Sequence, residues 1–356
     1  MTLFLTFVTS LIITYLSIPS IIKVADEKHL YDLPSEIKTS HSTGIPTLGG
    51  IAIFGGTLIT STFFIDFDTI PRFNYILCAM TLLFFTGVKD DVIPLTPSKK
   101  FIAQVISAGI LVFKANIRLT SLYGLFGIQA LPYWISISIS LFTIIVIINA
   151  FNLIDGINGL TGGVGIIVGL TFAFFFYQIQ ETGWVVFILA LCGSLMAFLK
   201  FNFANKIFMG DTGSLLVGCI SVVLCISFIE HPEVQKKYSN SFTPVFAFCI
   251  LIIPLFDTLR VFTIRIFNKK SPFQGDRKHL HHILVDGGLT HWQASFIMYL
   301  ANLSIILLAY SLKHISALFL LFGVLALCTV LSFLLVSFHK PKSKSSNINK
   351  PQAIEH

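Results

Sequence analysis

Residues 208–229, FMGDTGSLLVGCISVVLCISFI, contain one aspartate near their start and no charged side chain after it. An apolar run of this length is typical of a helix that crosses a bilayer, which needs about 20 predominantly apolar residues. The same pattern, a short polar cluster beside a long apolar run, recurs along the whole chain. It predicts an all-α protein built as a bundle of transmembrane helices.

The composition supports this fold class. Of the 356 residues 54% are hydrophobic and only 12% are charged, whereas a soluble domain has about 25% charged residues. The net charge of +7 comes from Lys and Arg in short connections between apolar runs. In such places basic residues act as topology signals and contact anionic membrane lipids. We therefore expect membrane lipids, and no nucleic acid, among the partners.

The apolar runs predict about eleven membrane spans, with residues 1–338 forming a single transmembrane domain. Residues 339–356 are rich in Lys, Ser and Asn and are expected to form a disordered basic tail. The first run lacks a basic leader, so it is expected to be a retained helix and not a cleaved signal peptide. The expected spans are 3–22, 48–65, 72–88, 101–115, 133–150, 159–179, 184–201, 213–229, 244–264, 293–311 and 315–338.

Lys and Arg also predict the orientation. With the N-terminus outside, most of the 24 Lys and Arg residues fall in inner connections, as the positive-inside rule requires. An odd number of spans then places the C-terminus in the cytoplasm. Two outer connections exceed a simple turn: 116–132, which is expected to form a small hairpin, and 230–241, which is expected to be a polar loop.

Polar residues gather at four helix ends, all on the predicted cytoplasmic side. The orientation rests on Lys and Arg alone, so this agreement is an independent indication of one shared site. The four clusters are Asp90 and Asp91; Asn149, Asn152, Asp155 and Asn158 in NAFNLIDGINGL; Asp211 in FMGDTGSLLVG; and Arg277, His279, His281 and His282 in SPFQGDRKHLHHIL.

Each cluster alone has a simpler explanation, such as a solvated helix end, a helix cap or interfacial histidines. Carboxylates near membrane level are costly, however, and usually mark a functional site. Mg²⁺ prefers a few carboxylates together with substrate phosphate oxygens, and phosphoryl transfer needs such charge neutralisation. Glycines such as Gly210 and Gly156 would allow close approach to this site.

The basic residues near these clusters can bind phosphate oxygens. Lys100, Arg265, Arg277 and the histidines are suited to a diphosphate. Zinc is the competing interpretation of the histidines, but no cysteine lies nearby and HLHH is not the i, i+4 pair of a zinc-binding helix.

The motifs resemble those of the polyprenyl-phosphate N-acetylhexosamine-1-phosphate transferases, across nearly the whole chain. The DRKHLHH loop resembles the bacterial branch that uses UDP-N-acetylglucosamine and undecaprenyl phosphate. The peptidoglycan branch, the phospho-MurNAc-pentapeptide transferases, usually has a different histidine loop and is the alternative within the family. The matching motifs, in the family's order, are TLGGIAI, KDDVIPLTPSKKFIAQ, NAFNLIDGINGL, FMGDTGSL and SPFQGDRKHLHHIL.

The resemblance implies a role for each matching residue. Asp90, Asp91, Asp155 and Asp211 would be catalytic, and Asp211, Asp91 and Asn152 would lie at a magnesium or manganese ion. The substrate-binding set would be Lys100, Asn149, Asn152, Asn158, Arg265, Arg277, His279, His281 and His282. The family often has an aspartate where this chain has Asn158, so a charged role at that position is in doubt.

The resemblance also implies a function for the 1–338 domain. It would transfer an N-acetylhexosamine-1-phosphate, with N-acetylglucosamine the first choice, from a UDP-sugar to undecaprenyl phosphate at the cytoplasmic face of the bacterial inner membrane. UMP would leave, and synthesis of a cell-envelope polysaccharide such as O-antigen lipopolysaccharide or a cell-wall polymer would begin. A homodimer is compatible with the family. The alternative from another class is a lipid or solute transporter, whose polar residues should lie near the bilayer midplane.

Overall fold

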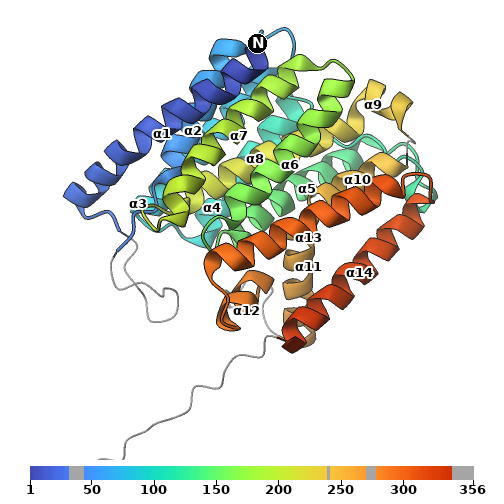
Figure 1. Cartoon of the computed structure of the whole chain (residues 1–356). Coiled ribbons are helices and arrows are strands. Elements are labelled where there is room, and N and C mark those ends of the chain that lie inside the picture. Colours follow the sequence, from blue (N-terminus) through green and yellow to red (C-terminus); the bar gives the residue numbers. More distant parts are fainter. Residues whose placement is uncertain (32–43, 239–240, 270–277, 339–356) are drawn as a thin grey trace, which may run out of the picture.

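The computed structural model describes residues 1–31, 44–238, 241–269 and 278–338, and the regular elements of these ranges are helices (Figure 1). The all-α prediction is therefore confirmed. The predicted disordered tail, 339–356, lies outside the described residues. The helices are α1 (Thr2–Lys28), α2 (Gly49–Phe64), α3 (Phe73–Val92), α4 (Pro97–Gly109), α5 (Tyr133–Ile154), α6 (Leu160–Gln178), α7 (Thr182–Phe203), α8 (Gly210–Glu230), α9 (Pro232–Lys237), α10 (Phe242–Ile250), α11 (Ile252–Phe267), α12 (Leu280–Asp286), α13 (His291–Ser311) and α14 (Ala317–Phe338).

Seven of the described helices are long and apolar enough to cross a membrane, namely α1, α5, α6, α7, α8, α13 and α14. An eighth crossing results if α10 and α11 count as one span, although they are bent by 83° at their junction. The other expected spans correspond to shorter or more polar elements. These are α2, with 16 residues, α3, whose last turn carries Lys89 and two aspartates, and α4, which continues into a π-helical turn at Ile110–Lys114. The count of eleven crossings stays a prediction.

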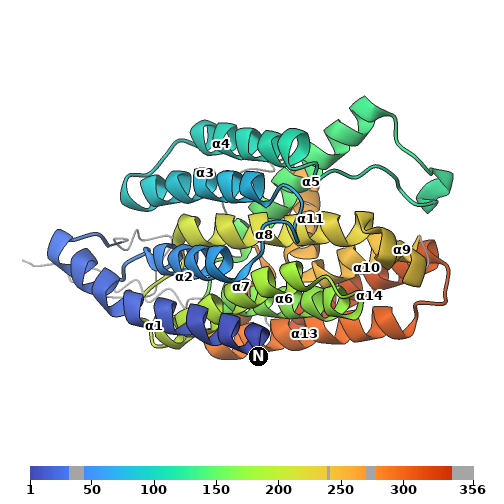
Figure 2. The same ribbon diagram turned by 90° about the horizontal axis from the view of Figure 1, so that it is seen from above.

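Helix α8 lies at the centre of the bundle. In Figure 2 it runs between a group formed by α3, α4 and α5 and a group formed by α2, α6 and α7, with α1 and α13 on the far side. Almost all of its side chains are buried, as expected for a helix that is apolar all round. Asp211, in the first turn of α8, therefore lies close to several neighbouring helices.

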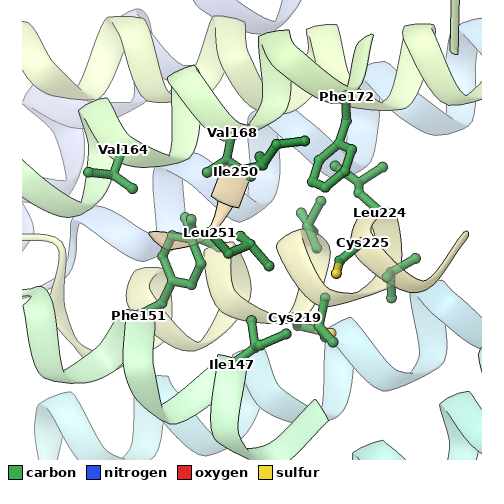
Figure 3. Close-up of a cluster of buried hydrophobic side chains, with 14 of the residues drawn as sticks. Ile147, Phe151, Val164, Val168, Phe172, Cys219, Leu224, Cys225, Ile250 and Leu251 are labelled. Atoms are coloured by element: carbon green, nitrogen blue, oxygen red, sulfur yellow. The ribbon is translucent and has the colours of Figure 1, made fainter. Parts of the chain in front are cut away.

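An apolar core supports α8 from both sides. Figure 3 shows side chains of α5, α6 and α8 converging with the junction of α10 and α11. Leu251, at that junction, is fully buried in this cluster, so the sharp bend is packed inside protein. The sequence indicated one unbroken span over 244–264, and the break is a correction to that expectation. Backbone groups freed by a break at membrane depth are tolerated where protein surrounds them.

The two outer connections differ in kind. Within 116–132, Ser121 and Ala130 form an isolated antiparallel bridge around a short 3-10 turn at Leu125–Gly127, so the expected small hairpin is reduced to a single bridge. The connection 230–241 was expected to be a loop, but it contains the short helix α9. Pro232 begins that helix, and proline is favoured at the first helical position. The side chain of His231 caps the helix by accepting a hydrogen bond from the N–H of Glu233.

Candidate active site

The first turn of α8 is held by Asp91, from the end of α3. Oδ1 of Asp91 accepts a hydrogen bond from the N–H of Asp211 at 2.8 Å, and Oδ2 accepts from the N–H of Thr212 at 3.0 Å. The Thr212 hydroxyl also donates to Oδ2, at 2.5 Å. The first N–H groups of a helix have no partner within it, so this carboxylate satisfies two of them. Asp91 thereby fixes the position of Asp211.

Gly210 allows α3 and α8 to come this close. Its φ is +72°, in the left-handed region that favours glycine. A Cβ at this position would lie 2.1 Å from the carbonyl oxygen of Thr47 and 2.6 Å from Oδ2 of Asp91. Both distances are far below van der Waals contact. The expectation that Gly210 permits close approach is confirmed.

Lys100, from α4, joins the carboxylates of Asp211 and Asp90. Its Nζ lies 2.6 Å from Oδ2 of Asp211 and also forms an ion pair with Oδ2 of Asp90. The other oxygen of Asp90 accepts from the N–H of Leu95 at 2.6 Å. Burial opposes the charge of Lys100, but the carboxylates of Asp211 and Asp90 outweigh it and raise the pKa of the ammonium group. Lys100 is therefore held charged between them.

Amide side chains of α5 complete this group. Nδ2 of Asn152 donates to Oδ1 of Asp211 at 3.1 Å and to the Ser214 hydroxyl at 2.9 Å. One turn earlier, Asn149 exchanges hydrogen bonds with Gln104 of α4. Asn152 thus contacts Asp211 directly, whereas Asn149 binds α4 and holds it to α5.

Asp155 ends α5 and begins the turn that leads to α6. Burial raises the pKa of its carboxyl to about 7, and the negative charges of Asp211 and Asp91 add to the shift. Burial likewise raises the pKa of Asp91 to about 7. Both shifts mean that the protein disfavours further negative charge here unless a cation compensates for it.

The charges of the group fit a divalent cation that arrives with substrate. Four carboxylates, those of Asp90, Asp91, Asp155 and Asp211, lie in this group, and the one ammonium group that bridges two of them is that of Lys100. Within the described residues, no three His, Cys, Asp or Glu side chains are arranged as a metal cage. Mg²⁺ is commonly bound by one or two carboxylates plus substrate phosphates and not by an all-protein cage. The donors present therefore suit magnesium completed by phosphate oxygens.

Asn158 lies in a different network, on the side of α7 and α13. Its Nδ2 donates to Oδ1 of Asn205, its N–H donates to Nδ1 of His291 at 3.4 Å, and its carbonyl accepts from Ser295. It also lines a surface pocket of about 750 Å³ with Phe203, Asn205, Thr290, His291 and Trp292. The bonds of Asn158 thus hold the 155–160 turn to its neighbours, and they need no charge at this position.

The histidines of α12 lie against the same turn. A Cβ on Gly156 would be 2.3 Å from Nε2 of His281 and 3.1 Å from Nε2 of His282. His279, immediately before α12, stacks on His281 with ring centroids 5.6 Å apart. The structure thus brings the histidine cluster beside Asp155. The expectation that Gly156 permits close approach is also confirmed.

The two predicted arginines are placed differently. Arg265 lies on α11 and is only 2% exposed, with its guanidinium 5.9 Å from the ring centroid of Phe262. Arg277 lies outside the described residues.

Two residues of this region were missed from the sequence. Thr212 could not be recognised because its partner, Asp91, lies 121 positions away in the sequence. Asp257 sits inside the apolar run 244–264 and is fully buried, bonded to His279. A carboxylate within an apolar run was the available signal, because such residues are rare and usually functional.

The chain is similar to known proteins over most of its length. Residues 73–229, which include all four aspartates, match the model of glycosyl transferase family 4. The chain is 30% identical over 300 residues to the probable undecaprenyl-phosphate N-acetylglucosaminyl 1-phosphate transferase of Bacillus subtilis (strain 168), covering 83% of this chain and 80% of that protein. It is 30% identical over 288 residues to the undecaprenyl-phosphate alpha-N-acetylglucosaminyl 1-phosphate transferase of Salmonella typhi, covering 78% and 75% of the two chains.

The enzyme of that same description from Yersinia pestis is 29% identical over 289 residues, which is 78% of this chain and 76% of the relative. The resemblance seen in the motifs thus extends over three quarters or more of each chain. The protein belongs to the polyprenyl-phosphate N-acetylhexosamine-1-phosphate transferases, and within them to the bacterial undecaprenyl-phosphate N-acetylglucosaminyl 1-phosphate transferase branch.

Proposed function

We propose that this protein transfers N-acetylglucosamine-1-phosphate from UDP-N-acetylglucosamine to undecaprenyl phosphate and releases UMP. Relatives that align with more than three quarters of the chain are named as undecaprenyl-phosphate N-acetylglucosaminyl 1-phosphate transferases, which supports the transferred group and the acceptor. The family match also covers the segment that contains the four aspartates of the site. The chain is therefore an enzyme that acts on a lipid-linked phosphate.

The observation that carries the proposal is the bridge from Lys100 to Asp90 and Asp211 at the ends of long apolar helices. Phosphoryl transfer depends on positioned charge around the phosphoryl group far more than on covalent chemistry. A site at helix ends also suits the acceptor. Its isoprenoid chain can remain among apolar side chains while its phosphate reaches the polar cluster.

Magnesium is the cofactor that these donors favour, and manganese has similar ligand preferences. Asp211 and Asn152 would hold it. Asp91, which the sequence also placed at the ion, has both oxygens on N–H groups of α8 and would act on the ion by holding Asp211 in place. The bound ion would supply charge neutralisation and polarisation of the donor phosphates. The side chains of the protein do the remaining work of binding and orienting the two substrates.

The reaction is a single displacement. An oxygen of undecaprenyl phosphate attacks the β-phosphorus of the UDP-sugar, the bond from that phosphorus to the bridging oxygen breaks, and UMP leaves. A phosphomonoester has a second pKa of about 6 and is largely ionised at neutral pH. Asp90 would accept any remaining acceptor proton, and Lys100 would orient the acceptor phosphate. His279, His281, His282, Arg265 and Arg277 would bind the donor.

The proposed membrane location rests on the distribution of Lys and Arg along the chain. The site would face the cytoplasm at the inner membrane of a bacterium, with eleven crossings and the N-terminus outside. Its product would begin a cell-envelope polysaccharide. A homodimer, which the family resemblance allows, would be seen as a doubled protein mass when the detergent-solubilised enzyme is measured by light scattering.

A donor-substitution experiment tests the proposal. Purified protein in detergent receives undecaprenyl phosphate, Mg²⁺ and one of several UDP-N-acetylhexosamines, and mass spectrometry follows the lipid product and UMP. We expect equal amounts of N-acetylglucosaminyl diphosphate lipid and UMP with UDP-N-acetylglucosamine. Transfer from only another UDP-sugar would keep the reaction and change the donor. A folded protein that releases no UMP with any donor would favour a transporter, because transport leaves the nucleotide intact.

A further inference from the structure

Asp257 is a carboxylate in an unusual place. It lies on α11, within an apolar segment, and its residue is 0% exposed. A buried carboxylate without partners would be strongly destabilising. The partners of this group are therefore expected to show what it is for.

Among the described residues, the hydrogen bonds of Asp257 outside its own helix lead to the start of α12. Oδ2 lies 2.8 Å from Nδ1 of His279, and Oδ1 accepts from the N–H of Leu280 at 3.0 Å. Arg260, one turn along α11, donates to Oδ1 at 3.3 Å and to the carbonyl oxygen of Lys278 at 2.8 Å. Helix α11 is thus bonded through Asp257 and Arg260 to the residues on both sides of His279.

The pair with Asp257 determines which nitrogen of His279 carries the proton. An ionised carboxylate only accepts hydrogen bonds, so Nδ1 of His279 must be the donor. In a neutral imidazole, Nε2 is then the acceptor atom. A side chain behind the histidine therefore selects its tautomer and fixes the plane of its ring.

The effect reaches the site through ring contacts. His279 stacks on His281 at an interplanar angle of 17°, and His281 lies 4.2 Å, centroid to centroid, from His282. The Nε2 atoms of His281 and His282 lie against Gly156, beside Asp155. A rotation of His279 or a shift at the start of α12 would move both neighbouring rings relative to the 155–160 turn.

We propose that Asp257 is a positioning residue of the transferase: it sets the tautomer and orientation of His279 and anchors α12 so that the three histidines face the donor. This inference rests on the proposed donor-binding role of the histidines. Asp257 itself touches no substrate in this account. Its removal should impair use of the UDP-sugar and leave use of the lipid acceptor nearly unchanged.

Asp257→Asn is the sharpest substitution. Oδ1 faces two donors, the N–H of Leu280 and the guanidinium of Arg260, so the amide should keep its oxygen there and turn its NH₂ toward His279. The amide then donates to Nδ1 and drives the proton to Nε2, while α12 stays attached. We expect kcat/KM for UDP-N-acetylglucosamine to fall about 10- to 100-fold, as when a group that orients a functional histidine is removed.

The control is Asp68→Asn, the same chemical change at an exposed aspartate between α2 and α3. It should transfer at the rate of the unaltered protein. The KM for undecaprenyl phosphate in Asp257→Asn should change by less than about twofold, because only an interaction with the donor is lost. An equal rise in both KM values would point to general disruption and overturn the positioning role.

Two further measurements separate positioning from mere stability. In protein labelled with ¹⁵N-histidine, NMR should find the His279 proton on Nδ1, and on Nε2 after Asp257→Asn, with the signal assigned by its loss in His279→Gln. In the His279→Gln background, adding Asp257→Asn should cause little further loss of transfer, because coupled residues are not additive.

The outcomes decide between the explanations. A proton on Nε2 of His279 in the unaltered protein would contradict the pair, even if Asp257→Asn does not yield folded protein. Full donor kcat/KM in Asp257→Asn, or losses that multiply in the double variant, would overturn the proposal. Failure of the unaltered protein to transfer any sugar would instead sink the proposed function, and the NMR result for the pair would stand by itself.

Discussion

The carboxylate of Asp91 accepts a hydrogen bond from the backbone N–H of Asp211 at 2.8 Å, so one aspartate of the site holds the other in place. Its neighbour Asp90 has a different role, because its oxygens bind Lys100 and the N–H of Leu95. Two adjacent aspartates that look equivalent in sequence therefore have different partners and different roles. Asp90 faces the charged centre, and Asp91 supports the helix that carries Asp211.

Asp91→Asn should weaken this support. The amide keeps one acceptor oxygen and turns an NH₂ group toward donors of α8, so the protein should lose about 1 kcal/mol of stability, as for a lost helix cap. Displacement of Asp211 should lower transfer about 10-fold or more. Thermal unfolding in detergent and a transfer assay measure the two effects, with Asp68→Asn as the control. Unchanged melting and unchanged transfer would contradict the role given to Asp91.

Lys100→Met should separate charge from packing. Methionine fills similar space but leaves the carboxylates of Asp90 and Asp211 without their shared cation. The more negative site should bind a divalent cation more readily, so half-saturation by Mg²⁺ should occur at a lower concentration. The maximal rate should nevertheless fall about 100-fold or more, because a charge-assisted contact with the phosphate is lost. A titration of transfer against Mg²⁺ gives both numbers, and a higher Mg²⁺ requirement would argue against this charge balance.

Gly156→Ala should disturb the histidines without unfolding the bundle. The added methyl group would lie 2.3 Å from Nε2 of His281, and relief of such overpacking costs about 1–3 kcal/mol. Gly55→Ala is the matched control, because nothing lies within 4 Å of a Cβ there and alanine favours the helix α2. We expect donor KM to rise only in Gly156→Ala. Equal donor KM in the two variants would show that the contact between Gly156 and His281 does not affect binding of the donor.

The carboxyl of Asp155 should make the stability of the metal-free protein depend on pH. Its pKa is raised from 3.8 to about 7 in the folded state, so the folded state binds a proton that the unfolded state has released. The resulting stabilisation is complete below about pH 4 and is lost as pH rises to about 7. Melting in EDTA should therefore be higher at pH 6 than at pH 8, and Asp155→Asn should reduce that difference. If the difference in melting temperature between pH 6 and pH 8 is as large in Asp155→Asn as in the unaltered protein, groups other than Asp155 cause it.

Much of the architecture could be predicted from local sequence. Apolar runs locate the helices because burial of a whole helix surface demands them. Helix-terminal clusters such as Asp90 and Asp91 could be assigned to a shared site because Lys and Arg orient the chain. The bend at Leu251 was missed although Pro254 was an available signal, because in an unbroken helix its ring would clash with the carbonyl of Ile250, where α10 ends. The angle of the break depends on the packing around Leu251, which no local pattern gives. The division of labour between Asp90 and Asp91 also depends on contacts with distant helices.

Asn158 illustrates the same limit within a motif. Its sequence position indicated substrate binding, but its observed partners are Asn205, His291 and Ser295. Those residues come from segments more than 40 positions away, so no local pattern identifies them. Asp257 is the opposite case, since its charge within an apolar run was visible in the sequence while its partner His279 was not.

Transfer of labelled sugar by Asp211→Asn tests the central claim most directly. Purified protein and the variant receive undecaprenyl phosphate, radiolabelled UDP-N-acetylglucosamine and Mg²⁺, with EDTA and Asp68→Asn as controls. We expect label to enter the lipid phase with the unaltered protein and with Asp68→Asn. We also expect EDTA to abolish this transfer and Asp211→Asn to reduce it by about 1,000-fold or more. Transfer by folded Asp211→Asn at the rate of the unaltered protein would contradict the assignment of the reaction to this cluster.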